Sequence, residues 1–187
     1  MRVIAGSARG LRLAAPAGLQ TRPTADRVKE ALFSIIASRR ELAGARVLDI
    51  CAGTGSLGIE ALSRGAASCC YIERDRHVLA LLEKNLAKAG LSDRGECLAL
   101  DAINGLNQLS KQGKMFDIVF FDPPYSSGLY ASVPESLSSL SLLSDEGLLV
   151  SECSARSPLA IRYGTLVRVD RRVYGDTALE FFVRGHT

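Results

Sequence analysis

The strongest constraint on the fold is a regular alternation of short apolar runs with amphipathic segments, which begins at Arg46. The apolar runs predict strands, and the segments between them have the apolar spacing of helices. Because helical crossovers join parallel strands, the alternation predicts an α/β fold with a parallel sheet covered on both faces. The predicted strands are Val47–Ile50, Cys69–Ile72, Cys97–Leu100, Asp117–Phe121 and Gly147–Ser151, and the predicted helices are Leu57–Arg64, Arg76–Ala89, Ile103–Gln112 and Tyr130–Leu143.

The C-terminal part of the chain breaks this alternation. Two further strands are predicted at Leu166–Tyr174 and Ala178–Val183, separated only by Gly175-Asp-Thr177. So short a connection forces an antiparallel hairpin, since parallel neighbours need a crossover. We therefore expect a mostly parallel, seven-stranded, Rossmann-like sheet that closes with an antiparallel hairpin.

The first 45 residues form a small N-terminal extension ahead of this α/β unit. Its apolar stretches Val3–Ala5 and Leu11–Ala14 predict a small hairpin. A helix is predicted from about Thr24, a candidate N-cap, with an apolar face formed by Val28, Leu32, Ile35 and Ile36. We divide the chain into an extension, residues 1–45, and a main domain, residues 46–187.

Composition excludes several classes of protein. No apolar run approaches the roughly 18 residues of a membrane span, and the N-terminus lacks the apolar core of a signal peptide. The five cysteines show no Cys-x-x-Cys spacing, which indicates free thiols in a reducing cytoplasm. His77 and His186 have no spaced partner for a zinc site or a catalytic triad, so no metal is expected.

The net charge of +3 conceals blocks of opposite sign. Residues 1–46 hold nine basic and three acidic side chains, residues 47–155 hold eight and fourteen, and residues 156–187 hold six and three. The balances are thus +6, −6 and +3. Such asymmetry indicates a polyanionic partner near the basic part, with a merely solvated basic surface as the alternative.

A glycine-rich turn links the first predicted strand of the sheet to a helix. Gly53, Gly55 and Gly58 match Gly-x-Gly-x-x-Gly, in which glycine lets the backbone turn tightly and approach a ligand. Glu73 lies twenty residues after Gly53, at the end of the second strand. A carboxylate there can accept hydrogen bonds from ribose hydroxyls, although a solvated acid at a strand end is the alternative.

The acids around the turn distinguish between two ligand classes. Asp49 precedes the turn, where a carboxylate disfavours a dinucleotide pyrophosphate and favours the cationic methionine moiety of S-adenosylmethionine. Asp101 could accept a hydrogen bond from an adenine amino group or cap the following helix. The residues expected to bind S-adenosylmethionine are Asp49, Ala52, Gly53, Thr54, Gly55, Ser56, Glu73, Arg74, Asp101 and Ala102.

The tetrapeptide Asp122-Pro123-Pro124-Tyr125 leaves the fourth predicted strand, and ligands bind at the carboxyl ends of strands in such sheets. The Asp122 carboxylate and the Pro123 carbonyl can accept both N–H groups of a nucleobase amine and so orient its lone pair. Tyr125 can stack on the base. We expect all four residues to form the catalytic site. The alternative is a strand terminator followed by a surface tyrosine.

Several longer motifs resemble the bacterial small-subunit ribosomal RNA guanine-N2 methyltransferases of the RsmD type. The resemblance covers essentially the whole chain, with one departure at Cys51, where that family usually has an aromatic residue. The matching stretches are Arg-Val-Ile-Ala-Gly-Ser-Ala-Arg-Gly at 2–10, Thr-Arg-Pro-Thr-Ala-Asp-Arg-Val-Lys-Glu-Ala-Leu-Phe at 21–33, Asp-x-x-Ala-Gly-Thr-Gly at 49–55, Leu-Gly-x-Glu-Ala-Leu-Ser-Arg-Gly-Ala at 57–66, Asp-Pro-Pro-Tyr at 122–125 and Tyr-Gly-Asp-Thr-Ala-Leu at 174–179.

The resemblance implies a class I methyltransferase fold, with residues 46–187 as the catalytic domain. It also implies methyl transfer from S-adenosylmethionine to the N2 amine of one guanine in 16S ribosomal RNA. Asp-Pro-Pro-Tyr does not separate guanine from adenine, so an adenine-N6 methyltransferase acting on DNA or RNA is the alternative. A protein-glutamine methyltransferase, a dehydrogenase and a catalytically silent RNA-binding module are weaker alternatives.

Given this resemblance, we expect the basic extension to bind RNA. A guanine amine inside a helix is inaccessible, so the nucleotide must be flipped or already unstacked, and the extension would hold the RNA over the site. We expect a monomer without a membrane partner, acting on 16S ribosomal RNA or on the small ribosomal subunit. The expected phosphate contacts are Arg2, Arg9, Arg12, Arg22, Arg27 and Lys29.

Overall fold

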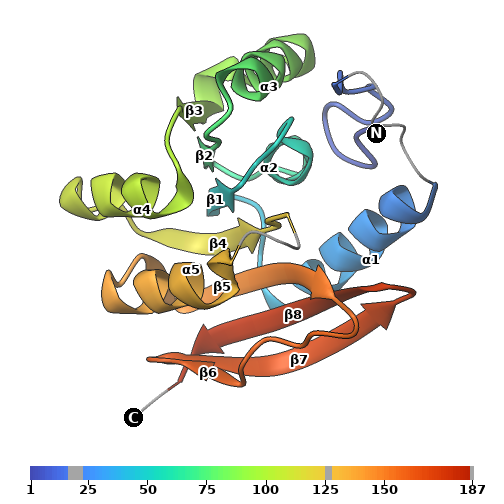
Figure 1. Cartoon of the computed structure of the whole chain (residues 1–187). Coiled ribbons are helices and arrows are strands. Elements are labelled where there is room, and N and C mark those ends of the chain that lie inside the picture. The colour runs from blue at the N-terminus through green and yellow to red at the C-terminus, as the bar shows by residue number, and fades with distance from the viewer. Residues whose placement is uncertain (17–22, 125–127, 186–187) are drawn as a thin grey trace.

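The computed structural model describes residues 1–16, 23–124 and 128–185, apart from the side chains of residues 23–25 (Figure 1). The helices are α1 (Pro23–Arg39), α2 (Ser56–Ser63), α3 (Arg76–Ala89), the short 3-10 helix η1 (Ser92–Arg94), α4 (Ala102–Lys111) and α5 (Leu129–Ser139). The strands are β1 (Arg46–Ile50), β2 (Ser68–Ile72), β3 (Gly95–Leu98), β4 (Phe116–Phe121), β5 (Leu143–Ser154), β6 (Arg162–Tyr163), β7 (Leu166–Tyr174) and β8 (Thr177–Arg184).

All strands of the described residues belong to one sheet, in the order β3-β2-β1-β4-β5-β8-β7-β6. The first five are parallel, and the last three are antiparallel to their neighbours. The expected parallel sheet with a closing hairpin is therefore confirmed. The described part has eight strands rather than seven, because the two-residue β6 pairs with the start of β7.

Strand pairing moves two element boundaries away from those that apolar periodicity predicts. Leu143 was expected to end a helix, but it begins β5 opposite Phe116, and α5 stops at Ser139. The third strand lies two residues earlier than expected, because Gly95 pairs with Cys69. In both cases contacts with a distant strand override the local pattern.

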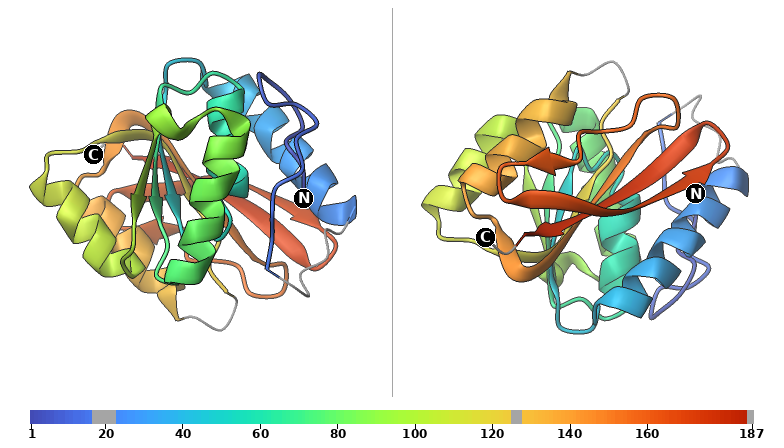
Figure 2. Two further views of the ribbon diagram at one scale, coloured as in Figure 1. Left: turned by 90° about the horizontal axis from the view of Figure 1, so that it is seen from above. Right: turned by 90° about the horizontal axis from the view of Figure 1, so that it is seen from below.

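Helices cover the parallel strands on both faces (Figure 2). α1, α2 and α3 pack on one face, in a buried cluster with Val47, Phe120 and Phe181. α4 and α5 pack on the other, in a second cluster that includes Leu48 and Phe121. None of the helices in the described part is long and apolar enough to cross a membrane.

Residues 1–14, the N-terminal arm, bring the two expected stretches together in antiparallel contact, but without regular strands. A single antiparallel bridge joins Arg2 and Arg12, with Val3 N donating to Leu11 O at 2.9 Å. The arm lies beside α2 and α3 (Figure 2), and buried side chains of these helices bind its backbone. The following helix begins at Pro23 rather than Thr24, which agrees with the preference of proline for the first helical position.

A buried carboxylate stabilises the closing hairpin. The Glu180 side chain is completely buried on β8. Its two oxygens accept hydrogen bonds from Arg168 Nη1 at 2.8 Å and Arg171 Nε at 3.0 Å, and Oε1 also accepts one from Leu159 N at 3.2 Å. Removing one partner of such a buried ionic group leaves the charges of the others uncompensated, which destabilises the fold.

We predict that Glu180→Ala lowers the free energy of unfolding by about 3 kcal/mol, since it leaves two arginines unpaired at a buried site. Urea denaturation measures this change. Glu146→Ala is the matched control, because the Glu146 side chain is 84% exposed and reaches Arg40 only at 3.9 Å. Equal stabilities of the two variants would contradict the prediction.

Candidate functional site

The turn after β1 has the backbone geometry that its glycines permit. Gly53 and Gly55 have φ angles of +55° and +81°, and a Cβ atom added at Gly53 would meet nothing within 4 Å. At Gly58, by contrast, a Cβ atom would lie 2.3 Å from Cε1 of Tyr71. The first glycine thus leaves open space for a ligand, and the third lets α2 pack closely on β2.

Two of the expected carboxylates hold this glycine turn, residues 51–58, in place. Asp49 Oδ2 accepts a hydrogen bond from Gly58 N at 2.9 Å. Glu73 Oε2 accepts one from Gly53 N at 2.9 Å, and its Oε1 accepts one from Asp75 N at the same distance. Each carboxylate therefore shapes the backbone of the turn while retaining further acceptor capacity.

The remaining expected donor-binding residues lie along the same edge of the sheet. Asp101 is the N-cap of α4, where its Oδ1 accepts a hydrogen bond from Asn104 N at 3.0 Å. The helix cap that we weighed for this residue is thus present, and its carboxylate is exposed. Arg74 is also exposed, whereas Ala102 is buried at the start of α4.

The structure describes three residues of the Asp-Pro-Pro-Tyr motif. Asp122 and Pro124 are exposed and Pro123 is buried. The Pro123 carbonyl accepts a hydrogen bond from the Tyr130 hydroxyl at 3.3 Å, which leaves it a second lone pair. Tyr125 lies outside the described residues, so its expected stacking role stays a prediction.

Four carboxylates share one face of the sheet at the carboxyl ends of adjacent strands. Each acid lies two residues after a core residue that its strand directs toward α1–α3, and side chains two apart share a face. The pairs are Val47 and Asp49, Tyr71 and Glu73, Phe120 and Asp122, and Val150 and Glu152. Phe121 pairs with Ser151, which puts the next residues, Asp122 and Glu152, on neighbouring strands. We call Glu73, Asp49, Asp122 and Glu152 the acidic row.

Desolvation makes three acids of the row, Asp49, Asp122 and Glu152, hold their protons unusually strongly. Desolvation raises the pKa of Asp49 to about 8, reinforced by the charges of Asp122 and Glu73. Desolvation also raises the pKa of Asp122 to about 6, although part of this residue contacts solvent. The pKa of the half-buried Glu152 rises to about 8, with a contribution from the charge of Asp122. A cation bound against the row would relieve this repulsion.

Glu152 was not among the expected site residues. The sequence carries a signal for it, because it follows an apolar strand just as Asp122 does. Asn85 was missed as well, although it follows Leu79 and Leu82 at helical spacing on the buried face of α3. Its contacts bear on the arm and are described below.

The expected RNA-contacting residues separate into two groups. Arg2, Arg9, Arg12 and Arg27 are exposed, and Arg22 lies outside the described residues. Lys29 does not fit the expectation, because only 4% of its side chain is exposed and its Nζ donates to Arg2 O at 2.6 Å and Ser56 Oγ at 3.2 Å. Lys29 is also 3.4 Å from the buried Glu60 carboxylate, so we assign it a structural role.

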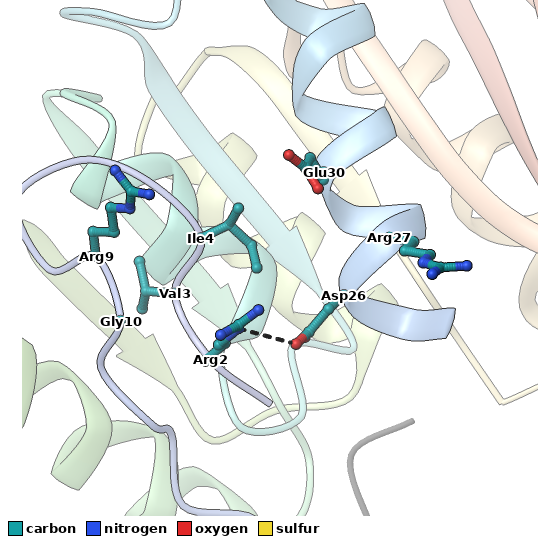
Figure 3. Close-up of a pocket in the computed structure, with 8 residues that line it drawn as sticks. All are labelled: Arg2, Val3, Ile4, Arg9, Gly10, Asp26, Arg27 and Glu30. Carbon is teal, nitrogen blue, oxygen red and sulfur yellow. Dashed lines mark ion pairs between the residues drawn. The ribbon is translucent and has the colours of Figure 1, made fainter. Parts of the chain in front are cut away.

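The exposed arginines surround a hollow of about 600 Å³ between the arm and the start of α1 (Figure 3). Arg2 and Arg9 line it from the arm, and Arg27 lines it from the helix. Asp26 also lines the hollow and forms an ion pair with Arg2 at 3.4 Å. Glu30 lines it too, so three arginines only just outnumber two acids around this accessible space.

Residues 1–183 match the model of the family described as conserved hypothetical protein 95. The chain belongs to this family. It is 38% identical over 159 residues to ribosomal RNA small subunit methyltransferase D of Escherichia coli (strain K12), covering 85% of this chain and 77% of that protein.

Solved structures show the same fold. The structure of yhhF from Escherichia coli matches with a TM-score of 0.87 and 36% identity, covering 100% of this chain and 99% of that one. The structure of SMU.776 complexed with SAH matches with a TM-score of 0.70 at 16% identity, covering 87% of this chain and 50% of that one. The architecture is that of class I methyltransferases, as expected.

We predict that the free energy of unfolding falls as the pH rises from about 4 to about 8. In this range the folded protein keeps a proton on Asp49, whose pKa is about 8, whereas the unfolded chain has lost it at the ordinary value of 3.8. Each such group contributes a slope of at most about 1.4 kcal/mol per pH unit.

Urea unfolding across this pH range measures the slope. Asp49→Asn should flatten the profile, because the amide cannot ionise while its oxygen can still accept from Gly58 N. The exposed Asp93→Asn variant should keep the profile of the parent protein. A parent profile that does not fall with pH would contradict the prediction.

Proposed function

We propose that this protein transfers a methyl group from S-adenosylmethionine to the exocyclic N2 amine of a guanine in 16S ribosomal RNA. The observation that carries the proposal is the acidic row beside the open glycine turn, with Asp-Pro-Pro at the carboxyl end of β4. The small-subunit rRNA methyltransferase D relative supports the RNA class, and the fold shared with an SAH complex supports the donor.

The residues present suit this donor. The open space at Gly53 admits a ligand to the backbone, and the acidic row complements an ammonium and a sulfonium. Glu73 stands where it could accept the ribose hydroxyls, and Asp101 retains exposed oxygen for an adenine amino group. The donor supplies a methyl group that is already activated, so the chain needs neither a metal nor a strong base.

The chain's task is to orient the nucleobase amine and to accept its proton. Asp122 and the Pro123 carbonyl accept the two N–H groups, which directs the nitrogen lone pair toward the methyl carbon. When bound, S-adenosylmethionine would supply the methyl group to this nitrogen and would leave as the neutral thioether S-adenosylhomocysteine. The nitrogen then carries positive charge, which the Asp122 carboxylate stabilises before taking one proton.

In this proposal the exposed arginines form the RNA-binding surface. Arg2, Arg9 and Arg27 surround the hollow between the arm and α1, and Arg12 is exposed near them on the arm. Phosphates of an RNA strand would neutralise these charges and displace counterions. The target base must leave its stack to reach Asp122, so contacts to the flanking backbone would compensate part of that cost.

Asp122→Ala should lower the methylation rate at least a hundredfold, because it removes an acceptor that acts on the charge developing at the amine. Affinity for S-adenosylhomocysteine should change only a few-fold. The assay uses labelled donor with small ribosomal subunits from cells lacking the activity, followed by mass spectrometry of the nucleosides. Asp145→Ala is the control, because Asp145 lies near the opposite end of β5 and its side chain is 86% exposed.

The product identifies the base. Methylguanosine modified at N2 supports the proposal. N6-methyladenosine would instead show that the protein is an adenine-N6 methyltransferase. If neither the parent protein nor Asp122→Ala methylates any substrate, including naked 16S RNA, methyl transfer is contradicted. The result would favour an RNA-binding module without catalytic activity.

The double variant Arg9→Gln/Arg27→Gln should bind RNA more weakly and reduce the slope of log affinity against log salt by about 1.4, since each contact to a single strand contributes about 0.7. Donor affinity should be unchanged. Lys111→Gln/Lys114→Gln removes the same charge before the amino end of β4, at the opposite edge of the sheet, and should keep the parent slope. Equal slopes in both variants would contradict the assignment.

A further inference from the structure

The backbone of the N-terminal arm is bound by buried side chains of α2. Glu60 is completely buried, and its two oxygens accept from Ile4 N at 2.7 Å and Ala5 N at 3.0 Å. Ser63 Oγ donates to Ala5 O at 2.6 Å and accepts from Ala8 N at 3.0 Å. The arm thus occupies its place through specific polar contacts with the helix that follows the glycine turn.

Gly6 shows how closely the arm approaches α2. Its φ is +84°, and a Cβ atom added there would lie 1.8 Å from the Ser63 carbonyl oxygen. A side chain cannot fit without moving the arm away from the helix. Gly10 has the same φ of +84°, but a Cβ atom there would meet nothing within 4 Å.

Two buried side chains contact the arm and the glycine turn at the same time. Lys29 Nζ donates to Arg2 O at 2.6 Å and to Ser56 Oγ at 3.2 Å. Near the other end of the arm, Asn85 Oδ1 accepts from Ala14 N at 2.7 Å, and its Nδ2 donates both to Ala14 O and to Thr54 O at 3.0 Å. Asn85 is only 1% exposed.

These contacts tie the position of the turn to the docking of the arm. Thr54 O accepts from Asn85, and the adjoining Gly55 N donates to Ala52 O at 2.9 Å, so the peptide between Thr54 and Gly55 is held from both sides. If the arm leaves, Asn85 loses two of its three bonds and Lys29 loses its shortest one. Unsatisfied buried polar groups are costly, so both side chains would then rearrange at the turn.

We propose that binding of the methyl donor at the glycine turn and docking of the N-terminal arm are coupled, with Asn85 and Lys29 as positioning residues that transmit the effect. The inference rests on the proposed function. Coupling between two sites is reciprocal, so the donor stabilises the docked arm by the same factor by which the docked arm tightens donor binding. The donor would then help to present Arg2 and Arg9 to RNA.

The first test needs no variant. Hydrogen exchange of the whole protein is compared with and without S-adenosylhomocysteine, at the arm amides of Ile4, Ala5, Ala8 and Ala14. Coupling predicts that the ligand slows exchange at these amides as well as in the turn. Protection confined to the turn and the adjacent strand ends would overturn the inference.

The second test undocks the arm. Gly6→Ala should weaken S-adenosylhomocysteine binding about tenfold, a typical size for coupling between sites, and should speed exchange along the arm. Gly10→Ala carries the same backbone strain without the clash and should bind the ligand within a factor of two of the parent. Calorimetry measures both affinities.

Asn85→Leu is the third variant, because leucine fills the same space without any of the three hydrogen bonds. It should weaken ligand binding and abolish the ligand-induced protection of the arm. Undocked arms in Gly6→Ala and Asn85→Leu together with parent ligand affinity would disprove coupling. A parent protein that binds no S-adenosylhomocysteine would instead refute the donor assignment, so the two failures are distinguishable.

Discussion

Parallel pairing of β2, β1, β4 and β5 places the carboxyl ends of four strands at one edge of the sheet, and the site depends on this arrangement. On the face toward α1–α3 each strand carries a buried apolar residue near its carboxyl end, and the next side chain on that face is an acid. Since side chains alternate along a strand, in-register pairing turns four separate sequence positions into a row on one face. The same pairing puts the Asp-Pro-Pro segment beside the glycine turn. The chemistry is therefore a consequence of strand register rather than of any local motif alone.

The acidic row has an energetic cost that its ligand would offset. Desolvation disfavours ionisation and raises the pKa values of Asp49, Asp122 and Glu152, and neighbouring negative charges add to the shift at Asp49 and Glu152. A donor with two positive centres would favour the ionised forms of the row and so restore the acceptor capacity of Asp122. Elsewhere on the same face, acid is paired with base: Glu60 is completely buried, and it contacts both Lys29 and Arg64. Among the described residues, the acids at the strand ends have no basic partner, whereas Glu60 behind them has two. Carboxyl groups whose pKa values are perturbed in this way cluster at functional sites.

Sequence patterns predicted the elements and the carboxyl-edge acids because both depend on local alternation. The strand-helix alternation, the closing hairpin and the positions of Asp49 and Asp122 follow from apolar periods of a few residues. Lys29 is a residue that local patterns misplace, because it lies in a basic segment but its partners, the buried Glu60 and the half-buried Ser56, come from another helix. Asn85 is a similar case, since its three bonds reach residues 31 and 71 positions away. Contacts at such separations depend on how helices pack, which periodicity does not encode.

The basic arm and the acidic row carry opposite charges, yet both are supported by the same buried cluster. Val3 and Leu13 of the arm belong to the same buried cluster as Val47 of β1, so the arm is packed into the core that supports the turn. Lys29 and Asn85 extend that packing into hydrogen bonds that reach Ser56 and Thr54. An RNA-binding segment attached by a flexible linker would leave the donor site indifferent to RNA. Because the arm's backbone shares buried partners with the turn, the proposed coupling would make any movement of the arm change the proposed donor site, and recognition of the two proposed substrates would then be one structural event.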